Sequence, residues 1–154
     1  MREKPKQQMR IWGMLCHFSA LLGWILLFFL VFIGIPLYLP LNLLPPLVIW
    51  RFRKSQYSWI DFQGKESLNF QITWTLYTLL VMAISLFVVA TNFIWVVATN
   101  RSNQVQITLD NLLIVFMPLI LLILIGQLFV VTFAAIKAYQ GQHYRYPLTI
   151  RVLR

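Results

Sequence analysis

The sequence has few acidic residues, few charges overall and a single cysteine. Only 4 of its 154 residues are Asp or Glu, against 13 Lys or Arg, which gives a formal net charge of +9. Charged residues make up 11% of the chain and hydrophobic residues 60%, whereas a soluble domain is about a quarter charged. This composition excludes a water-soluble globule and a disordered chain. The single cysteine, Cys16, excludes an intrachain disulfide and a knuckle of cysteine metal ligands.

The sequence also lacks the motifs of common enzymes. It contains no Gly-x-Ser-x-Gly elbow, P-loop, His-Glu-x-x-His motif or dinucleotide fingerprint. Its acidic residues are too dispersed to form a catalytic carboxylate pair, and no His, Cys and Glu cluster has the spacing of metal ligands. We therefore expect no enzymatic activity, no cofactor and no metal site.

Three long stretches, 11–50, 68–100 and 111–136, contain no charged residue. A membrane-spanning helix needs about 20 largely apolar residues, so the second and third stretches each predict one span. The first stretch is long enough for more than one, but prolines from Pro36 to Pro46 interrupt its second half. Its remainder, 37–52, would cover only about 24 Å as a helix. It is either a short, Pro-broken crossing or a hairpin that enters and returns.

The distribution of basic residues favours the crossing. Three groups would share one side of the membrane if the chain crosses four times, and only Arg101 would face the other side. The groups are Arg2, Lys4, Lys6 and Arg10; Arg51, Arg53, Lys54 and Lys65; and Lys137, Arg145, Arg151 and Arg154. Because short cytoplasmic loops carry the excess of Lys and Arg, we place both termini in the cytoplasm.

The sequence thus predicts an all-α integral membrane protein, a four-helix transmembrane bundle whose second crossing is short and Pro-broken. The predicted parts are helices over about 11–33, 37–52, 65–98 and 110–138 within a membrane domain 11–140, an interfacial loop over 53–64, and basic cytoplasmic tails over 1–10 and 141–154. The basic residues beside the helix ends predict contact with anionic lipid head groups and no binding of nucleic acid.

Polar residues indicate two candidate sites. Glu66, Asn69 and Thr73 are separated by three and then four residues and would form one stripe on the third helix, with Gln127 of the last helix as a partner. Such a stripe is typical of bonds between membrane helices, and the alternative is a polar groove for a solute or a passing peptide. In the loop, Asp61 would cap the third helix and pair with Lys65.

Two further features concern the C-terminal tail and the first helix. Tyr144, Arg145 and Tyr146 would offer a contact surface on the cytoplasmic tail, as would the loop around Asp61. His17 lies about two turns inside the first helix, which makes it a candidate functional residue. The commoner outcome is a neutral histidine bonded to a neighbouring carbonyl.

Three sequence blocks resemble a known family. They are His17–Gly23, Gly64–Ile72, and Ala134–Ala138 followed by Gly141 and Tyr144–Arg151. The chain resembles, from about Leu15 to Leu153, a family of small bacterial multi-pass membrane proteins with a domain of unknown function. That family is described as similar to the twenty-kilodalton subunit of the chloroplast inner-envelope import translocon (Tic). The resemblance implies a multi-pass fold and brings no catalytic residue.

We therefore expect a multi-pass membrane protein that acts as a non-enzymatic scaffold or accessory subunit of a membrane complex. The alternative is a subunit of a small transporter or protein-translocation pore. A protein partner or a homo-oligomer is expected in either case. The expected location is the cytoplasmic membrane of a bacterium, and the alternative is a plastid membrane of bacterial origin.

Overall fold

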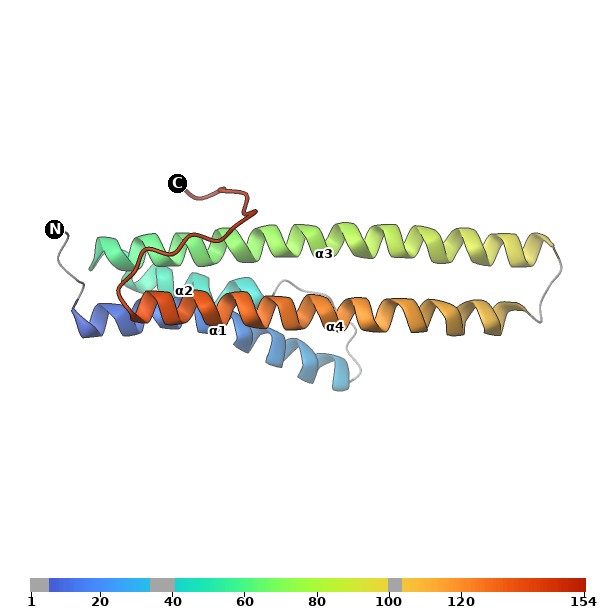
Figure 1. The fold of residues 1–154 in the computed structure, drawn as a ribbon, viewed down its shortest axis with the longest axis horizontal. Coiled ribbons are helices and arrows are strands. Elements are labelled where there is room, and N and C mark those ends of the chain that lie inside the picture. The colour runs from blue at the N-terminus through green and yellow to red at the C-terminus, as the bar shows by residue number, and fades with distance from the viewer. Residues whose placement is uncertain (1–5, 34–40, 100–103) are drawn as a thin grey trace. The chain divides into compact units, whose positions relative to one another are not determined.

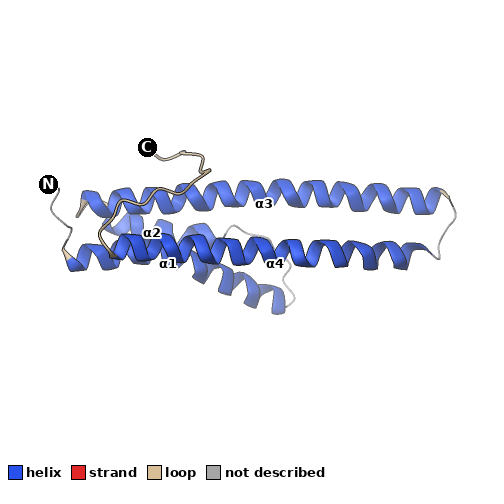
Figure 2. Ribbon diagram, viewed as in Figure 1, coloured by secondary structure: helices blue, strands red, loops and turns tan. Residues whose placement is uncertain are grey.

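The computed structural model describes residues 6–33, 41–99 and 104–154, and within these ranges the regular elements are all helices, with no strand (Figures 1 and 2). In chain order the elements are α1 (Gln7–Phe32), the 3-10 turn η1 (Leu41–Leu43), α2 (Leu44–Arg53), α3 (Ser58–Ala98) and α4 (Gln104–Tyr139). The predicted all-α class is confirmed.

Among the described residues, three helices are long and apolar enough to cross a membrane. The candidate spans are Gln7–Leu30, Ser58–Ala98 and Leu121–Tyr139. Helix α2 has 10 residues, which cover about 15 Å, too little for a hydrocarbon core of about 30 Å. Residues 37–40 of the expected second crossing lie outside the described ranges. The described part of the chain therefore contains three candidate spanning helices where the sequence predicts four.

The predicted loop over 53–64 is wrong for most of its length. Helix α3 begins at Ser58, so Asp61 lies within its first turn and does not cap it. The side-chain carboxylate of Asp61 accepts a hydrogen bond of 2.9 Å from the Trp50 indole and pairs with Lys65 at 2.7 Å. Polar composition suggested a loop, but Trp59, Ile60 and Gln63 are buried at the spacing of one helix face.

The chain divides into two compact units. The first contains Met1–Thr75 and Leu128–Arg154, and the second contains Leu76–Gln127. Apolar side chains of the second unit, such as Leu86 and Phe87, are exposed, as expected of a surface that faces lipid. Polar side chains there bond to carbonyls of their own helix: Ser85 donates to Val81, and Asn92 donates to Val88.

Within the first unit, α2 runs back along α1. A Cβ atom on Gly23 would lie 2.4 Å from the Cα of Asn42, so η1 packs directly on the middle of α1. At the other end of α2, the Arg53 guanidinium lies 4.2 Å from the centre of the Trp12 ring. The basic C-terminal end of α2 therefore lies near the N-terminal end of α1.

The close packing at Gly23 yields a stability prediction. Gly23→Val should destabilise the protein by about 1–3 kcal/mol, because the new side chain meets backbone atoms that cannot rotate away. Thermal unfolding in detergent should show a lower midpoint. Gly126→Ala is the control, since nothing lies within 4 Å of the Cβ position in α4. A midpoint for Gly23→Val equal to that of the wild type would contradict the packing of η1 on α1.

Candidate functional site

The first half of α3 carries two buried polar stripes. One contains Glu66, Asn69 and Thr73, and the other contains Gln63, Ser67 and Gln71 at i, i+4, i+8 spacing. Buried polar groups require hydrogen-bond partners, because an unsatisfied one costs about 1–3 kcal/mol. The partners of these residues define the candidate site.

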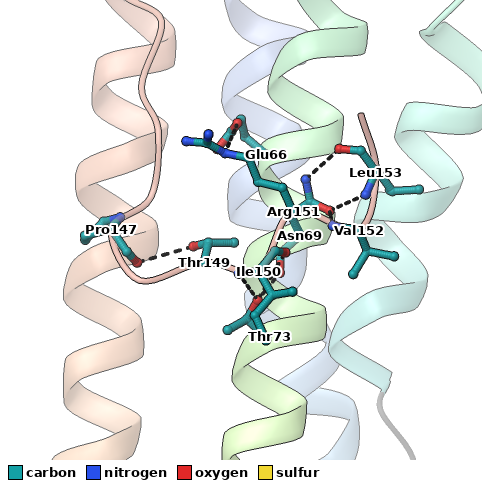
Figure 3. A network of polar contacts seen from close by, with 9 residues as sticks. All are labelled: Glu66, Asn69, Thr73, Pro147, Thr149, Ile150, Arg151, Val152 and Leu153. Atoms are coloured by element: carbon teal, nitrogen blue, oxygen red, sulfur yellow. Dashed lines mark hydrogen bonds and ion pairs between the residues drawn. The ribbon is translucent and has the colours of Figure 1, made fainter.

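The stripe Glu66–Thr73 holds the C-terminal segment of the chain, residues 146–154, which lies along α3 (Figures 1 and 3). The Asn69 side-chain oxygen accepts hydrogen bonds from the backbone N–H groups of Val152 (3.1 Å) and Leu153 (2.8 Å). Its side-chain nitrogen donates to the Leu153 carbonyl at 2.9 Å. One turn further on, the Thr73 hydroxyl accepts from the N–H of Ile150 at 2.9 Å.

Electrostatic attraction adds to these bonds. The Arg151 Nε lies 4.0 Å from a carboxylate oxygen of Glu66, whose side chain is buried. Because a buried charge is costly without a compensating one, Arg151 helps to keep the C-terminal segment over Glu66. The docked segment is thus held by one charge pair and by side-chain bonds to its main chain.

A second set of bonds joins α1, α3 and the C-terminal segment through His17. Its Nε2 lies 2.9 Å from the side-chain oxygen of Gln63, and its Nδ1 lies 2.8 Å from the hydroxyl of Tyr146. The Gln63 side-chain nitrogen donates to the Gln142 carbonyl at 3.0 Å, which leaves its oxygen as an acceptor. A neutral His17 protonated on Nε2 satisfies every bond, with Tyr146 donating to Nδ1.

Tyr146 is a buried anchor of the C-terminal segment. Its ring is 4% exposed and stacks on Phe70 with 4.1 Å between ring centres. Burial raises the pKa of the Tyr146 hydroxyl well above its ordinary value of 10.0, so the hydroxyl keeps its proton and donates to His17. The expectation that Tyr146 forms part of an exposed contact surface is therefore wrong, because its ring fills the core between α3 and α4.

The stripe Gln63–Gln71 bonds to other elements. Ser67 donates to the Cys16 carbonyl of α1 at 2.8 Å, and the Gln71 side-chain oxygen accepts from Asn42 of η1 at 2.8 Å. Sequence reasoning missed Gln63, Ser67 and Asn42 as partners. The i, i+4 spacing of Gln63, Ser67 and Gln71 was available as a signal, but the predicted loop over 53–64 removed Gln63 from the helix.

The other predicted residues of this unit, Tyr144 and Arg145, follow His143 in the chain. His143 packs edge-on against Trp59 (4.4 Å between ring centres) and Phe62 (4.8 Å). Arg145 is exposed and lies 5.8 Å from the Phe62 ring, whereas Tyr144 is half-buried. Gln127 is buried on α4 in the second unit, so its pairing with Asn69 and Thr73 stays a prediction.

The chemistry of this arrangement is recognition of an extended main chain. The Asn69 side chain accepts from and donates to backbone groups of successive residues and bonds to no side chain of the segment. The site therefore recognises the extended main chain more than the particular sequence of the segment. Within the described ranges, no group of three or more His, Cys, Asp and Glu side chains could hold a metal ion.

The bonds to Asn69 predict how the C-terminal segment can be released. Asn69→Leu should remove three hydrogen bonds and weaken docking by about 1–3 kcal/mol. Trypsin cleavage after Arg145 and Arg151 should then accelerate roughly tenfold or more, since about 1.4 kcal/mol corresponds to a factor of ten. Mass spectrometry of the released fragments measures the rate.

Asn92→Leu is the matched control, because the Asn92 side chain is exposed on the same helix and donates to its own helix at Val88. It should leave the cleavage rate at its wild-type value. Equal rates for Asn69→Leu and the wild type would show that these bonds do not hold the segment.

Comparisons with known proteins place this architecture in a family. Neither the curated proteins nor the solved structures contain a match to this chain. Among protein families, residues 8–153 match the MamF/MmsF family, described as the magnetosome magnetite crystal formation protein family. This match and the apolar helices indicate a small bacterial membrane protein, whereas the predicted relation to the Tic subunit is not shown. Because the match covers nearly the whole chain, the protein belongs to the magnetosome magnetite crystal formation family.

Proposed function

We propose that this protein is a non-enzymatic accessory subunit that acts as a scaffold in the membrane where magnetite crystals form. Family membership supports the process. The observation that carries the scaffold role is that separate parts of the chain meet at one end of the first unit. Arg53 lies over Trp12, His143 contacts Trp59, and Gln63 bonds to Gln142. These contacts form a composite surface from the start of α1, the end of α2, the start of α3 and the end of α4.

This composite surface presents both aromatic and polar side chains to a partner. Phe52 is 74% exposed and Tyr57 is 40% exposed, beside the exposed Arg51 and Gln56. Exposed aromatic rings among basic groups are favoured at protein interfaces and at lipid head groups. We infer that a protein partner or a second copy docks here, while neighbouring cations such as Lys54 contact anionic head groups.

The transporter alternative gains no support from the site. It requires Asn69 and Thr73 to line a pathway, but both are bonded to the main chain of the C-terminal segment. We therefore retain the scaffold.

Site-specific photo-crosslinking tests the scaffold proposal. A photoreactive residue at Phe52 should form adducts with protein in native membranes, because this ring is exposed on the composite surface. Ile94 is the matched control, being 64% exposed on the apolar part of α3, and should form lipid adducts alone. Monomer with lipid adducts at both positions would overturn the proposal. Trp59 is unsuited as a probe site because it is buried.

We further propose the topology that the charge distribution predicts, with both termini in the cytoplasm and four crossings, the second of them through 37–52. The return of α2 to the N-terminal end of α1 supports this orientation, because it brings Arg53 over Trp12, two residues after the basic Arg10.

Reporter fusions test this topology directly. Fusions after Lys54 and after Arg101 should report opposite compartments, with the first in the cytoplasm, because α3 separates the two positions. The same compartment at both positions would refute the orientation. A fusion at the N-terminus should agree with the one after Lys54.

A further inference from the structure

The second half of α3 carries a polar stripe that no other part of the article's candidate site uses. Thr78, Ser85, Asn92 and Thr99 recur at intervals of seven residues. Because an α-helix drifts by only about 20° over seven residues, these four side chains lie on one side of the helix. Three of them bond to a carbonyl four residues earlier in their own helix: Ser85 to Val81, Asn92 to Val88 and Thr99 to Trp95.

The later part of this stripe is uncovered. Asn92 and Thr99 are exposed. Val88 and Trp95, which precede and follow Asn92 by four and three residues, are 38% and 69% exposed. On the other side of Asn92, Val96 is only 6% exposed. The four exposed residues Val88, Asn92, Trp95 and Thr99 therefore form one open face of the helix, which we call the Asn92 face.

Asn92 is the chemically distinct residue of this face. It is the only residue from Leu76 to Ala98 with an amide or charged side chain. Its nitrogen donates to the Val88 carbonyl at 2.7 Å, which leaves the amide a second N–H and an oxygen that can accept. Exposed neighbours such as Phe93 and Ile94 are suited to lipid, but an amide that faces lipid is costly. Asn92 therefore requires a partner from outside its own helix.

The chemistry of the amide identifies this partner as a second copy of the chain. An amide is self-complementary, because it donates and accepts through the same group. Copies that enter the membrane with one orientation hold Asn92 at the same depth, and a twofold axis normal to the membrane places it opposite its own equivalent. The interval of seven residues is also the period at which two helices pack along one left-handed seam.

We propose that α3 pairs in parallel with α3 of a second copy through the Asn92 face, with reciprocal hydrogen bonds between the two Asn92 side chains at its centre. Val88 and Trp95 pack against their equivalents on either side and separate the amides from lipid. This face belongs to the second unit, whereas the composite surface of the scaffold proposal belongs to the first. The pairing thus adds a contact between copies to the contacts that the proposed function assigns to the first unit.

Cysteine crosslinking in native membranes tests this interface. Trp95→Cys and Ile94→Cys are made separately in the full-length chain. The two positions are adjacent in sequence and similarly exposed, at 69% and 64%. Ile94 is the matched control, because two residues correspond to about 200° of rotation, so that it faces away from Asn92. The native Cys16 is fully buried and is common to both variants.

The pairing predicts different rates at the two positions. Under mild oxidation, Trp95→Cys should form a disulfide-linked species of twice the mass of the chain severalfold faster than Ile94→Cys. Equal rates would overturn the proposal, because random collisions would then account for both products. No product at either position would also overturn it, as would a product of another mass from Trp95→Cys, which would indicate a different partner.

The role of the amide is tested in the Trp95→Cys background. Asn92→Leu should lower the crosslinking rate roughly threefold to thirtyfold, the range expected for a hydrogen bond between membrane helices. Asn92→Gln retains the amide and should retain most of the rate. An unchanged rate for Asn92→Leu would overturn the role of Asn92.

Tryptic cleavage after Arg145 and Arg151 reports whether Asn92→Leu leaves the first unit folded, and it should proceed at the wild-type rate. The comparison of Trp95→Cys with Ile94→Cys needs no change at Asn92 and tests the face independently. Failure of the scaffold proposal would appear in the crosslinks at Phe52 and would leave these measurements unchanged.

Discussion

Hydrogen bonding of the buried polar groups on α3 is the constraint on which the rest of the first unit depends. Asn69, Gln63 and Gln71 are almost fully buried, and a buried amide without partners is costly. Each obtains a partner from another part of the chain: the C-terminal segment, α1 or η1. The other elements are therefore bonded to the polar first half of α3, and the side chains of this half determine where each element docks.

This constraint makes the C-terminal segment a structural part of the protein. A basic tail of this composition would be free in solution if its main chain had no partner, yet Tyr146 enters the core and Asn69 holds Leu153. The bond from Tyr146 to His17 then links the end of the chain to α1, 129 residues earlier. Burial raises the pKa of Tyr146, so its hydroxyl stays protonated and donates in this link.

The spanning helices could be predicted from the sequence because they depend on composition. The features that depend on which groups form hydrogen bonds with each other could not. Long charge-free stretches identify α1, α3 and α4 without any knowledge of contacts, because lipid requires an apolar surface. The stripe Glu66, Asn69 and Thr73 could be found from helical spacing, but its partner could not, since Asn69 binds main-chain atoms that every residue shares. The boundary at Ser58 was missed because Gln63 appears polar in sequence, and its burial depends on His17 from α1.

The length of α3 explains why one helix carries two different surfaces. Its 41 residues cover about 60 Å, roughly twice the hydrocarbon core of a bilayer. From Leu76 onward α3 exposes apolar side chains, which are suited to lipid. The half before Leu76 must be covered by protein, because Asn69 and Gln71 would be costly in lipid. Helix α1, the turn η1 and the docked C-terminal segment provide this cover through their bonds to Gln63, Gln71 and Asn69.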